Sequence, residues 1–388
     1  MVDTSMNALL ENATASLVGR VYRPDVAGPS VVRIEGGRVI DITAAFPTVR
    51  DLCEAGNPAS ALRAAEGEDI GSVEEILKNA AVEVRDASRP YFLAPVDLQA
   101  LKAAGVTFVV SMLERVIEER IRGDAAAAAG MRARIASLVG DDIRNLKPGS
   151  PEAAKLKEAL IEAGAWSQYL EVGIGPDAEI FTKGQPLSAV GTGVDIGVHP
   201  ASTWNNPEPE VVLVVSSAGK VVGATLGNDV NLRDVEGRSA LLLGKAKDNN
   251  GACAIGPFIR LFDAHFDMND VRRLELSLAV DGPEGFRMTG HSSMSEISRD
   301  PEDLVAQAVN AHHCYPDGFV LFLGTMFAPI QDRDEPGRGF THKTGDVVTI
   351  SAPQLGALVN RVQPTDRAAP WGFGASHLMR NLAARNLL

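Results

Sequence analysis

The chain has 388 residues, of which 45% are hydrophobic and 22% charged, a composition typical of a globular protein large enough for more than one domain. Its formal net charge is −13, which argues against a nucleic-acid surface and against a polybasic membrane anchor. The three cysteines lack metal-site spacing, so we expect buried packing roles in a reducing compartment.

The sequence shows neither a membrane span nor a signal peptide. No run approaches the roughly 18 uninterrupted apolar residues of a membrane span. The first residues also lack the basic segment and apolar core of a signal peptide. We therefore expect a cytoplasmic protein with neither a membrane nor a nucleic-acid partner.

Residues 1–90 are expected to form a small N-terminal α/β domain. Two apolar runs flank Gly36-Gly37, which predicts two strands joined by a tight turn. Short helices are expected at 49–55 and 73–80. No residue of this region suggests chemistry, so packing or dimerisation is its expected role.

Residues 91–388 are expected to form the second domain. A buried strand is predicted at 105–110, and the pattern then turns helical from about 112 to 170. The alanine run at 125–129 favours helix. A second helix follows a Pro/Gly break and runs over 151–164. We interpret 112–170 as a helical insertion.

From residue 169 onward, short β-type runs alternate with Gly, Pro and Asn. Helices are expected at 233–243 and 301–311. The coarse class is α+β, with a mixed sheet closed on itself or stacked on a second layer. Strands are expected at 179–182, 211–215, 221–226, 274–280, 319–323, 347–350 and 358–362.

A β-hairpin is predicted around Ala218-Gly219, because two β-rich runs flank this turn signal. With these two residues as the loop, Ser217 pairs with Lys220. The same register places Glu208 opposite Asp229. A slip of one residue would turn Asp229 to the other face.

Three carboxylates converge in this register. Glu208 and Glu210 share one face because side chains alternate along a strand. Gly227 falls opposite Glu210 and leaves space there. Facing like charges destabilise a sheet, so the patch requires a cation, and an all-oxygen site suits Mg²⁺, Mn²⁺ or Ca²⁺. The alternative is that both glutamates form the solvent face of an ordinary strand.

These residues and their surroundings resemble the fumarylacetoacetate hydrolase family over about residues 91–388. That family binds Mg²⁺ or Mn²⁺ through Glu-x-Glu and a later Asp, which Glu208, Glu210 and Asp229 match. Lys247, in Gly-Lys-Ala-Lys-Asp-Asn-Asn, matches its active-site lysine. The resemblance implies a mixed β-sandwich roll, with the N-terminal domain and the helical insertion as additions.

Substrate-binding candidates also follow from the resemblance. Lys183 matches the lysine of a Phe-x-Lys segment near the family's pocket. Thr325 matches a turn that faces the substrate carboxylate, and Arg233 follows the loop of the metal-binding Asp. Glu236 is expected to pair with Arg233 or Arg238.

One position departs from the family's hydrolases, which carry a His and a Glu three residues apart to activate water. Here Glu114 is kept, and Ser111 stands at the His position. Serine does not replace His as a general base near neutral pH. This departure, the Asn-Asn-Pro-Glu-Pro-Glu run and residues 327–333 resemble the sugar-acid branch, the 2-keto-3-deoxy-pentonate dehydratases.

That branch implies dehydration of a 2-keto-3-deoxy-D-xylonate or D-arabinonate to 2-ketoglutarate semialdehyde. The alternative is a hydrolase that cleaves a carbon–carbon bond of a 2,4-diketo-3-deoxy sugar acid. A third, non-enzymatic interpretation is a Ca²⁺-stabilised β protein.

The catalytic candidates are Glu114 for acid–base work, Lys247 for holding the enolate or relaying a proton, and Ser111 beside them. Each has a structural alternative: Glu114 as an ion pair along its helix, and Lys247 as a solvated lysine at a helix end. The expected partner is a small 2-keto acid, and the expected assembly is a homodimer or homotetramer.

Overall fold

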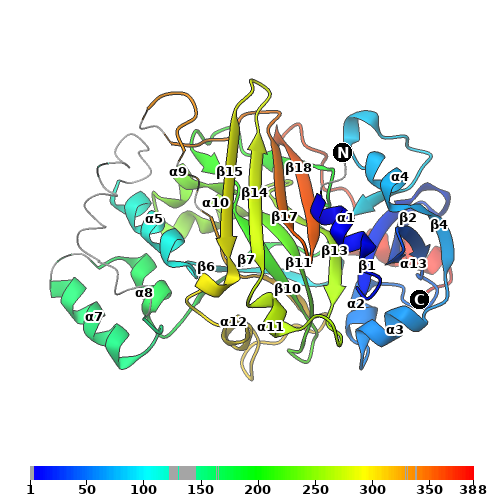
Figure 1. Cartoon of the computed structure of the whole chain (residues 1–388), viewed down its shortest axis with the longest axis horizontal. Coiled ribbons are helices and arrows are strands. Elements are labelled where there is room, and N and C mark those ends of the chain that lie inside the picture. The colour runs from blue at the N-terminus through cyan, green and yellow to red at the C-terminus, as the bar shows by residue number, and fades with distance from the viewer. Residues whose placement is uncertain are drawn as a thin grey trace.

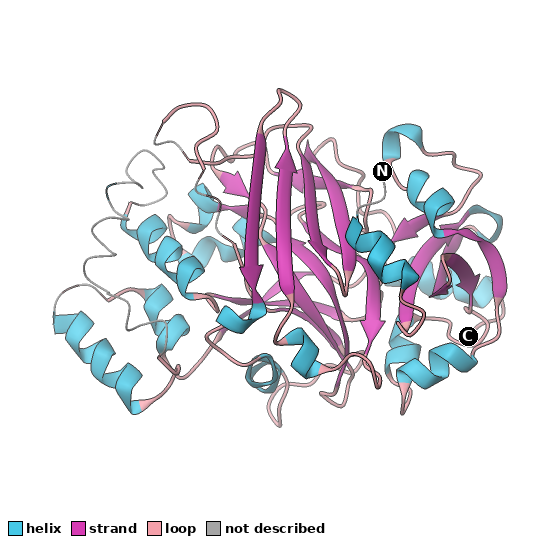
Figure 2. Cartoon of the chain, viewed as in Figure 1, coloured by secondary structure: helices cyan, strands magenta, loops and turns pink. Residues whose placement is uncertain are grey.

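The structure is a computed structural model that describes residues 4–121, 130, 146–162, 164, 166–327, 329, 331–336 and 339–388. The alanine run at 125–129, predicted to be helical, lies outside these residues. Figures 1 and 2 show a β-rich centre with helices gathered at both ends of the long axis.

A large mixed sheet crosses the molecule. Its described strands are β1 (Leu17–Arg23), β2 (Gly28–Glu35), β3 (Arg38–Asp41), β4 (Glu68–Ser72), β5 (Tyr91–Leu93), β6 (Ala100–Gly105), β7 (Glu179–Gly184), β10 (Pro209–Val215), β11 (Val221–Asp229), β13 (Cys253–Leu261) and β16 (Phe319–Phe322). Their order is β4-β3-β2-β1-β13-β11-β10-β16-β6-β7, with β5 paired to β1. The pairing is antiparallel except between β16 and β6.

A smaller sheet lies over the first and faces the viewer in Figure 1. Its strands are β8 (Asp195–Val198), β14 (Glu275–Asp281), β15 (Arg287–Ser293), β17 (Val347–Ala352) and β18 (Gly356–Pro364), in the order β15-β14-β17-β18-β8. A short ladder joins β9 (Asn205–Asn206) to β12 (Asn231–Leu232).

Alternation along β10 explains why the larger sheet is buried on both faces. Val211 and Leu213 pack into the core shared with the smaller sheet, whereas Val212 and Val214 pack into a second core on the opposite face. A strand buried on both faces reads as a continuous apolar run rather than as an alternating one. The rigid centre of the fold therefore lies under the predicted carboxylates.

Helices form the two ends. On one side lie α5 (Val109–Arg120), α7 (Pro151–Glu162) and α8 (Gln168–Ile174), which share a core that includes Val116, Leu160 and Leu170. The other helices among the described residues are α1 (Thr4–Glu11), α2 (Val49–Cys53), α3 (Pro58–Ala64), α4 (Val73–Lys78), α9 (Arg233–Glu236), α10 (Leu243–Lys247), α11 (Met268–Val271), α12 (Pro301–Ala308) and α13 (Ala375–Ala384). Among the described residues, no helix combines the length and apolarity needed to cross a bilayer.

The N-terminal strands continue the large sheet instead of forming a separate one. β1 pairs with β13 through Leu17 and Arg260, and α13 returns to the same end, where Asn381 donates to the carbonyl oxygen of Val26 at 2.8 Å. The division of the chain into two domains at residue 90 stays a prediction. Backbone hydrogen bonds such as those between β1 and β13 connect the parts of the chain before and after that residue.

The seven predicted strands are confirmed, although the sequence missed several others: β1, β4, β5, β6, β8, β9, β12, β13 and β15. The strand predicted at 105–110 is wrong, because β6 ends at Gly105 and Val106 has φ 59°, which breaks the extended chain before α5. The helix predicted at 233–243 is divided into α9, a 3₁₀ turn over Ala240–Leu242, and α10. Cys53 and Cys253 are buried as expected, but Cys314 is exposed.

Candidate active site

The β10–β11 hairpin confirms the register that the carboxylates require. Glu210 lies opposite Gly227, and the Asp229 backbone N–H donates to the Glu208 carbonyl at 3.0 Å. The space beside Gly227 is not open, however. A Cβ on Gly227 would lie 2.3 Å from Phe322 and 2.5 Å from Val212, so these side chains fill it.

The predicted turn is wrong by one residue. Ser216, not Ser217, pairs with Lys220: its N–H donates to the Lys220 carbonyl at 2.9 Å. The register then shifts by one between Val214 and Val215. Such a bulge inserts one extra residue into one strand of the pair. The two irregularities cancel, and the predicted pairing holds at the far end of the hairpin.

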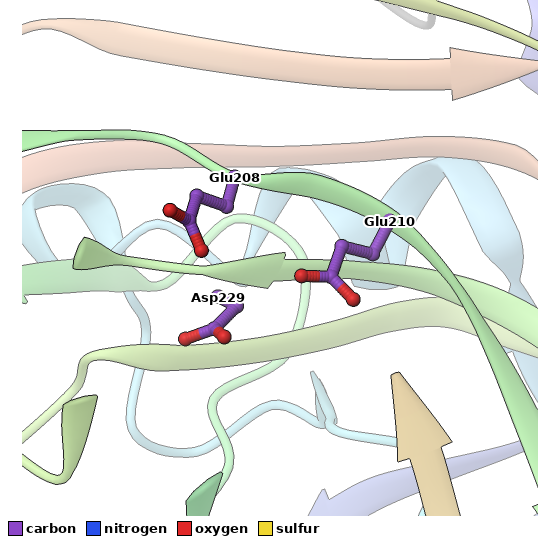
Figure 3. Close-up of side chains that lie close together, drawn as sticks. All are labelled: Glu208, Glu210 and Asp229. Atoms are coloured by element: carbon purple, nitrogen blue, oxygen red, sulfur yellow. The ribbon is translucent and has the colours of Figure 1, made fainter. Parts of the chain in front are cut away.

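Three carboxylates meet at that end. Figure 3 shows Glu208, Glu210 and Asp229 directed toward one another from the two strands. Each offers an oxygen within 4.8 Å of the others, and none of the three residues is more than 2% exposed. Burial, together with the charges of Asp229 and Glu208, raises the pKa of Glu210 well above its ordinary value.

Two lysines neutralise part of this charge. The Nζ of Lys247, at the end of α10, contacts Glu208 and lies 3.1 Å from Asp229 Oδ2. The Nζ of Lys183, on β7, lies 2.7 Å from Asp229 Oδ1. Burial lowers the pKa of Lys247, but the charges of Asp229, Glu208 and Glu236 outweigh it and hold the pKa above its usual range. Lys247 is therefore a fixed cation, not a solvated helix-end lysine.

The sequence did not suggest Arg115 as a site residue, although it contacts the carboxylate group. It lies on α5, one turn after Ser111, and forms an ion pair with Glu208. The Nη1 atom of Arg115 lies 3.1 Å from Glu236 Oε2. The sequence had suggested Arg233 or Arg238, not Arg115, as the partner of Glu236. The i, i+4 spacing from Ser111 is the signal that predicts a shared helix face.

Glu179 is the second residue that the sequence did not single out. It is at the start of β7, and burial, together with the nearby charge of Glu236, raises its pKa to about 7. Glu179, Phe181 and Lys183 share one strand face by alternation. Because Lys183 had been singled out, that period-two pattern already pointed to Glu179.

A small cavity of about 10 Å³ joins these groups. This volume holds about one water molecule, so there is space for an ion between the carboxylates. A substrate is larger, so it can enter only if α5 or its neighbours move. The polar residues that line it are Ser111, Arg115, Glu179, Glu208, Glu210, Asp229, Glu236, Lys247 and Thr325.

Two predicted residues stand beside the cavity. Glu114 accepts a hydrogen bond of 3.1 Å from Nη2 of Arg233, whose guanidinium stacks on the Trp204 ring at 4.3 Å. Neither Glu114 nor Arg233 lines the cavity, and neither does Lys183, which is buried beneath Asp229. Their predicted roles in catalysis and substrate binding stay predictions, as does that of Thr325, which does line it.

The formal charges give a test of whether a divalent cation fits. With every carboxyl group ionised, Glu179, Glu208, Glu210, Asp229 and Glu236 supply five negative charges, and Arg115, Lys183 and Lys247 supply three positive ones, which leaves 3 − 5 = −2. A bound cation favours this ionised state, because it lowers the raised pKa values of Glu179 and Glu210. One divalent cation neutralises that remainder. The three convergent carboxylates are also the oxygen ligands that hard cations prefer.

Comparison with known proteins agrees with this geometry. The sequence pattern described as fumarylacetoacetate (FAA) hydrolase C-terminal matches residues 157–363, more than half of the chain. The chain belongs to the fumarylacetoacetate hydrolase family. The matched segment contains all three carboxylates, both lysines and Glu179, whereas Ser111, Glu114 and Arg115 lie before it.

Two curated relatives carry dehydratase names. A probable 2-keto-3-deoxyxylonate dehydratase of Haloferax volcanii is 32% identical over 201 residues, which is 52% of this chain and 65% of that protein. A 2-dehydro-3-deoxy-D-arabinonate dehydratase of Saccharolobus solfataricus is 28% identical over 268 residues, 66% of this chain and 86% of that protein.

Solved structures share the fold. A 2-keto-3-deoxyarabinonate dehydratase superposes with a TM-score of 0.63 over 90% of this chain and 99% of its own, at 21% identity. A structure of such an enzyme in complex with magnesium and 2,5-dioxopentanoate gives a TM-score of 0.60 at the same identity and coverage. A 5-carboxymethyl-2-hydroxymuconate delta-isomerase from Mycobacterium smegmatis gives 0.53 at 18% identity, with 90% and 98% coverage.

Proposed function

We propose that this protein is a metal-dependent dehydratase that converts a 2-keto-3-deoxy-pentonate of the D-xylonate or D-arabinonate type into 2-ketoglutarate semialdehyde. The observation that carries the proposal is the buried carboxylate triad with a fixed lysine and a glutamate of raised pKa beside it. The two dehydratase relatives support the same reaction class.

In this reaction a proton leaves C3, and the hydroxyl group leaves C4. The leaving hydroxyl takes up a proton and departs as water. A proton then leaves C5 and one is returned to C3, which moves the C3=C4 double bond to C4=C5. The enol formed at C5 takes up a proton at C4 and loses its hydroxyl proton to give the aldehyde. Glu208, Glu210 and Asp229 would hold a divalent cation, Mg²⁺ or Mn²⁺. When bound, that ion supplies Lewis-acid stabilisation for negative charge on the substrate's carboxylate and 2-keto oxygens.

Glu179 is our candidate for moving the proton. A carboxyl group with a pKa of about 7 accepts and returns protons near neutral pH, as a general acid–base requires. It lines the cavity that Glu208 and Lys247 also line. Glu114 is the second candidate, less favoured because Arg233 engages its carboxylate outside the cavity.

Lys247 keeps its charge and faces the carboxylates, so it would stabilise negative charge on the reacting oxygen. Arg115, Thr325 and the Ser111 hydroxyl line the rest of the cavity and would bind the substrate's carboxylate and hydroxyls. The Glu114–Arg233 pair would position α5 above the substrate. We also propose that the protein assembles as a homodimer or homotetramer, which light scattering measures.

Product analysis tests the proposal. The purified protein is incubated with Mg²⁺ and, separately, with 2-keto-3-deoxy-D-xylonate, 2-keto-3-deoxy-D-arabinonate and a 2,4-diketo-3-deoxy-pentonate. We expect semialdehyde from one or both of the first two and no cleavage of the third. Pyruvate and glycolate from the third substrate, with no semialdehyde from the others, would identify a hydrolase and overturn the proposal.

A further inference from the structure

A second pocket lies where the N-terminal strands meet the C-terminal tail. Its lining comes mainly from β1, β5, Arg85 and residues 369–373, and from the loops 187–191 and 250–251, which we call its floor. It has a volume of about 220 Å³, far larger than the closed active-site cavity. We call it the seam pocket.

The seam pocket is cationic although the whole chain is acidic. Two arginines, Arg20 and Arg85, contribute to its lining, and no Asp or Glu does so among the described residues. The nearby carboxylates of Asp97 and Asp195 act on Arg20 and Arg85 but do not line the pocket. A pocket of this charge attracts anions.

Arg20 leaves binding capacity unused. Its side chain is 5% exposed, and its Nη1 donates to the carbonyl oxygens of Ala94 at 3.2 Å and Val96 at 2.5 Å. Its nearest carboxylate, that of Asp97, lies 3.7 Å from Nε. Among the described residues no hydrogen-bond acceptor serves Nη2. This donor is not enclosed by protein, so it is open to the pocket and available to a ligand.

Four aromatic side chains also line the pocket: Tyr22, Tyr91, Trp371 and Phe373. Tyr22 and Tyr91 stack with centroids 5.2 Å apart, and Arg85 lies 3.8 Å above the Tyr91 ring. Trp371 is 48% exposed, and its Nε1 donates to the Phe373 carbonyl at 3.1 Å, which fixes the orientation of the indole. Fixed ring faces beside guanidinium groups suit a ligand that is both flat and anionic.

The floor of the pocket is strained. Leu187 has φ 68°, a left-handed conformation that is unfavourable for a large side chain, and its N–H donates to the Asp97 carbonyl at 3.0 Å. Residues in such conformations cluster at ligand-binding sites. The floor is also close along the chain to the active centre: Leu187 follows Lys183 by four residues, and Asn250 follows Lys247 by three.

We propose that the seam pocket is a ligand site, separate from the carboxylate centre, for a small planar aromatic anion. The ring stacks on Trp371, and the anionic group pairs with Arg85 and the free donor of Arg20. A nucleoside monophosphate and an aromatic carboxylate share this chemistry. A carboxylate or phosphate without a ring lacks the stacking, and a ring without a charge lacks the ion pair.

Tryptophan fluorescence and calorimetry on the full chain test the site with four probes. AMP and 4-hydroxybenzoate carry both features, adenosine carries only the ring, and ribose 5-phosphate carries only the charge. We expect saturable quenching by AMP or 4-hydroxybenzoate, with binding about tenfold or more tighter than that of adenosine and ribose 5-phosphate. Which of the first two binds identifies the source of the ligand.

Two variants locate the binding. Arg85→Gln and Trp371→Leu are expected to weaken the bound probe about tenfold in calorimetry, since each removes one of the two interactions. Arg89→Gln, an exposed arginine of the same segment that does not line the pocket, is the matched control. Melting temperatures within a few degrees of the parent establish that the variants fold. The proposal is overturned if no probe binds, or if both pocket variants bind as tightly as the control.

Discussion

The strand side and the helix side of the active centre differ in what holds them. Glu208, Glu210 and Asp229 come from two central strands whose register is fixed by backbone hydrogen bonds and by a core on each face. Ser111 and Arg115 come from α5 at the end of the molecule, where contacts to the sheet are made by side chains. On our proposal, the strand side is therefore preorganised to bind the ion, whereas the helix side is the part that moves to admit the substrate.

The largest effect is expected from the strand side. Glu208→Gln or Asp229→Asn removes one of three charged ligands, so divalent-cation affinity should fall by about a hundredfold or more and turnover should disappear. Calorimetry with Mg²⁺ and Mn²⁺ measures the affinity. Glu275→Gln, an exposed strand glutamate, is the matched control. Parent-like cation affinity in either ligand variant would refute the ligand assignment.

Glu179→Gln is expected to lower turnover by about 10²–10⁴-fold while it leaves cation affinity nearly unchanged, because it removes the proton-transfer group but no ligand. The pH–rate profile should also lose the limb that reports its ionisation. Unchanged turnover would exclude Glu179 from the chemistry and favour Glu114.

The same variant has a pH-dependent effect on stability in metal-free protein. Because the folded-state pKa of Glu179 is raised from 4.5 to about 7, its stabilising contribution is complete below pH 4.5 and is lost as the pH rises through 7. Relative to the parent, Glu179→Gln should therefore gain up to about 3 kcal/mol between pH 4.5 and pH 8. Denaturant unfolding with chelator at the two pH values measures this difference, and a constant difference would contradict the burial argument.

Arg115→Met changes the helix side of the site alone. It removes a cation that pairs with Glu208, so cation affinity should rise by about tenfold, while turnover should fall because the cavity loses a substrate contact. Arg120→Met, on the last turn of the same helix, is the control. A fall in cation affinity would show that Arg115 supports the ion site instead of competing with it.

The smallest effect is expected at Ser111. Ser111→Ala removes one hydroxyl from the cavity, and a single neutral hydrogen bond is worth about 1 kcal/mol, or about fivefold in kcat/KM. Steady-state kinetics with the semialdehyde as product measures it. A loss of a thousandfold would give Ser111 a direct role in proton transfer.

The same contrast explains how far the sequence predicted the site. The carboxylate triad was predicted because alternation and one hairpin determine it, and it survived a wrong turn at Ser216 because a bulge restored the register. Glu179 was missed although it shares a strand face with Lys183, because the family resemblance at this strand indicates only the lysine.

The helix side was less predictable for a physical reason. Partners such as Glu114 with Arg233, or Arg115 with Glu236, join residues more than a hundred positions apart, and no local pattern encodes them. The fold shows the same limit. The apolar runs at 211–215 and 319–323 predicted strands, but the end of β6 depended on one left-handed residue, Val106.

The most direct test of the account is metal depletion and restoration. Protein stripped with a chelator is assayed with 2-keto-3-deoxy-D-xylonate and 2-keto-3-deoxy-D-arabinonate for semialdehyde, before and after addition of Mg²⁺ or Mn²⁺. We predict no product without the ion and full turnover once about one equivalent is bound. Equal rates of semialdehyde formation in the stripped and restored protein would contradict the account.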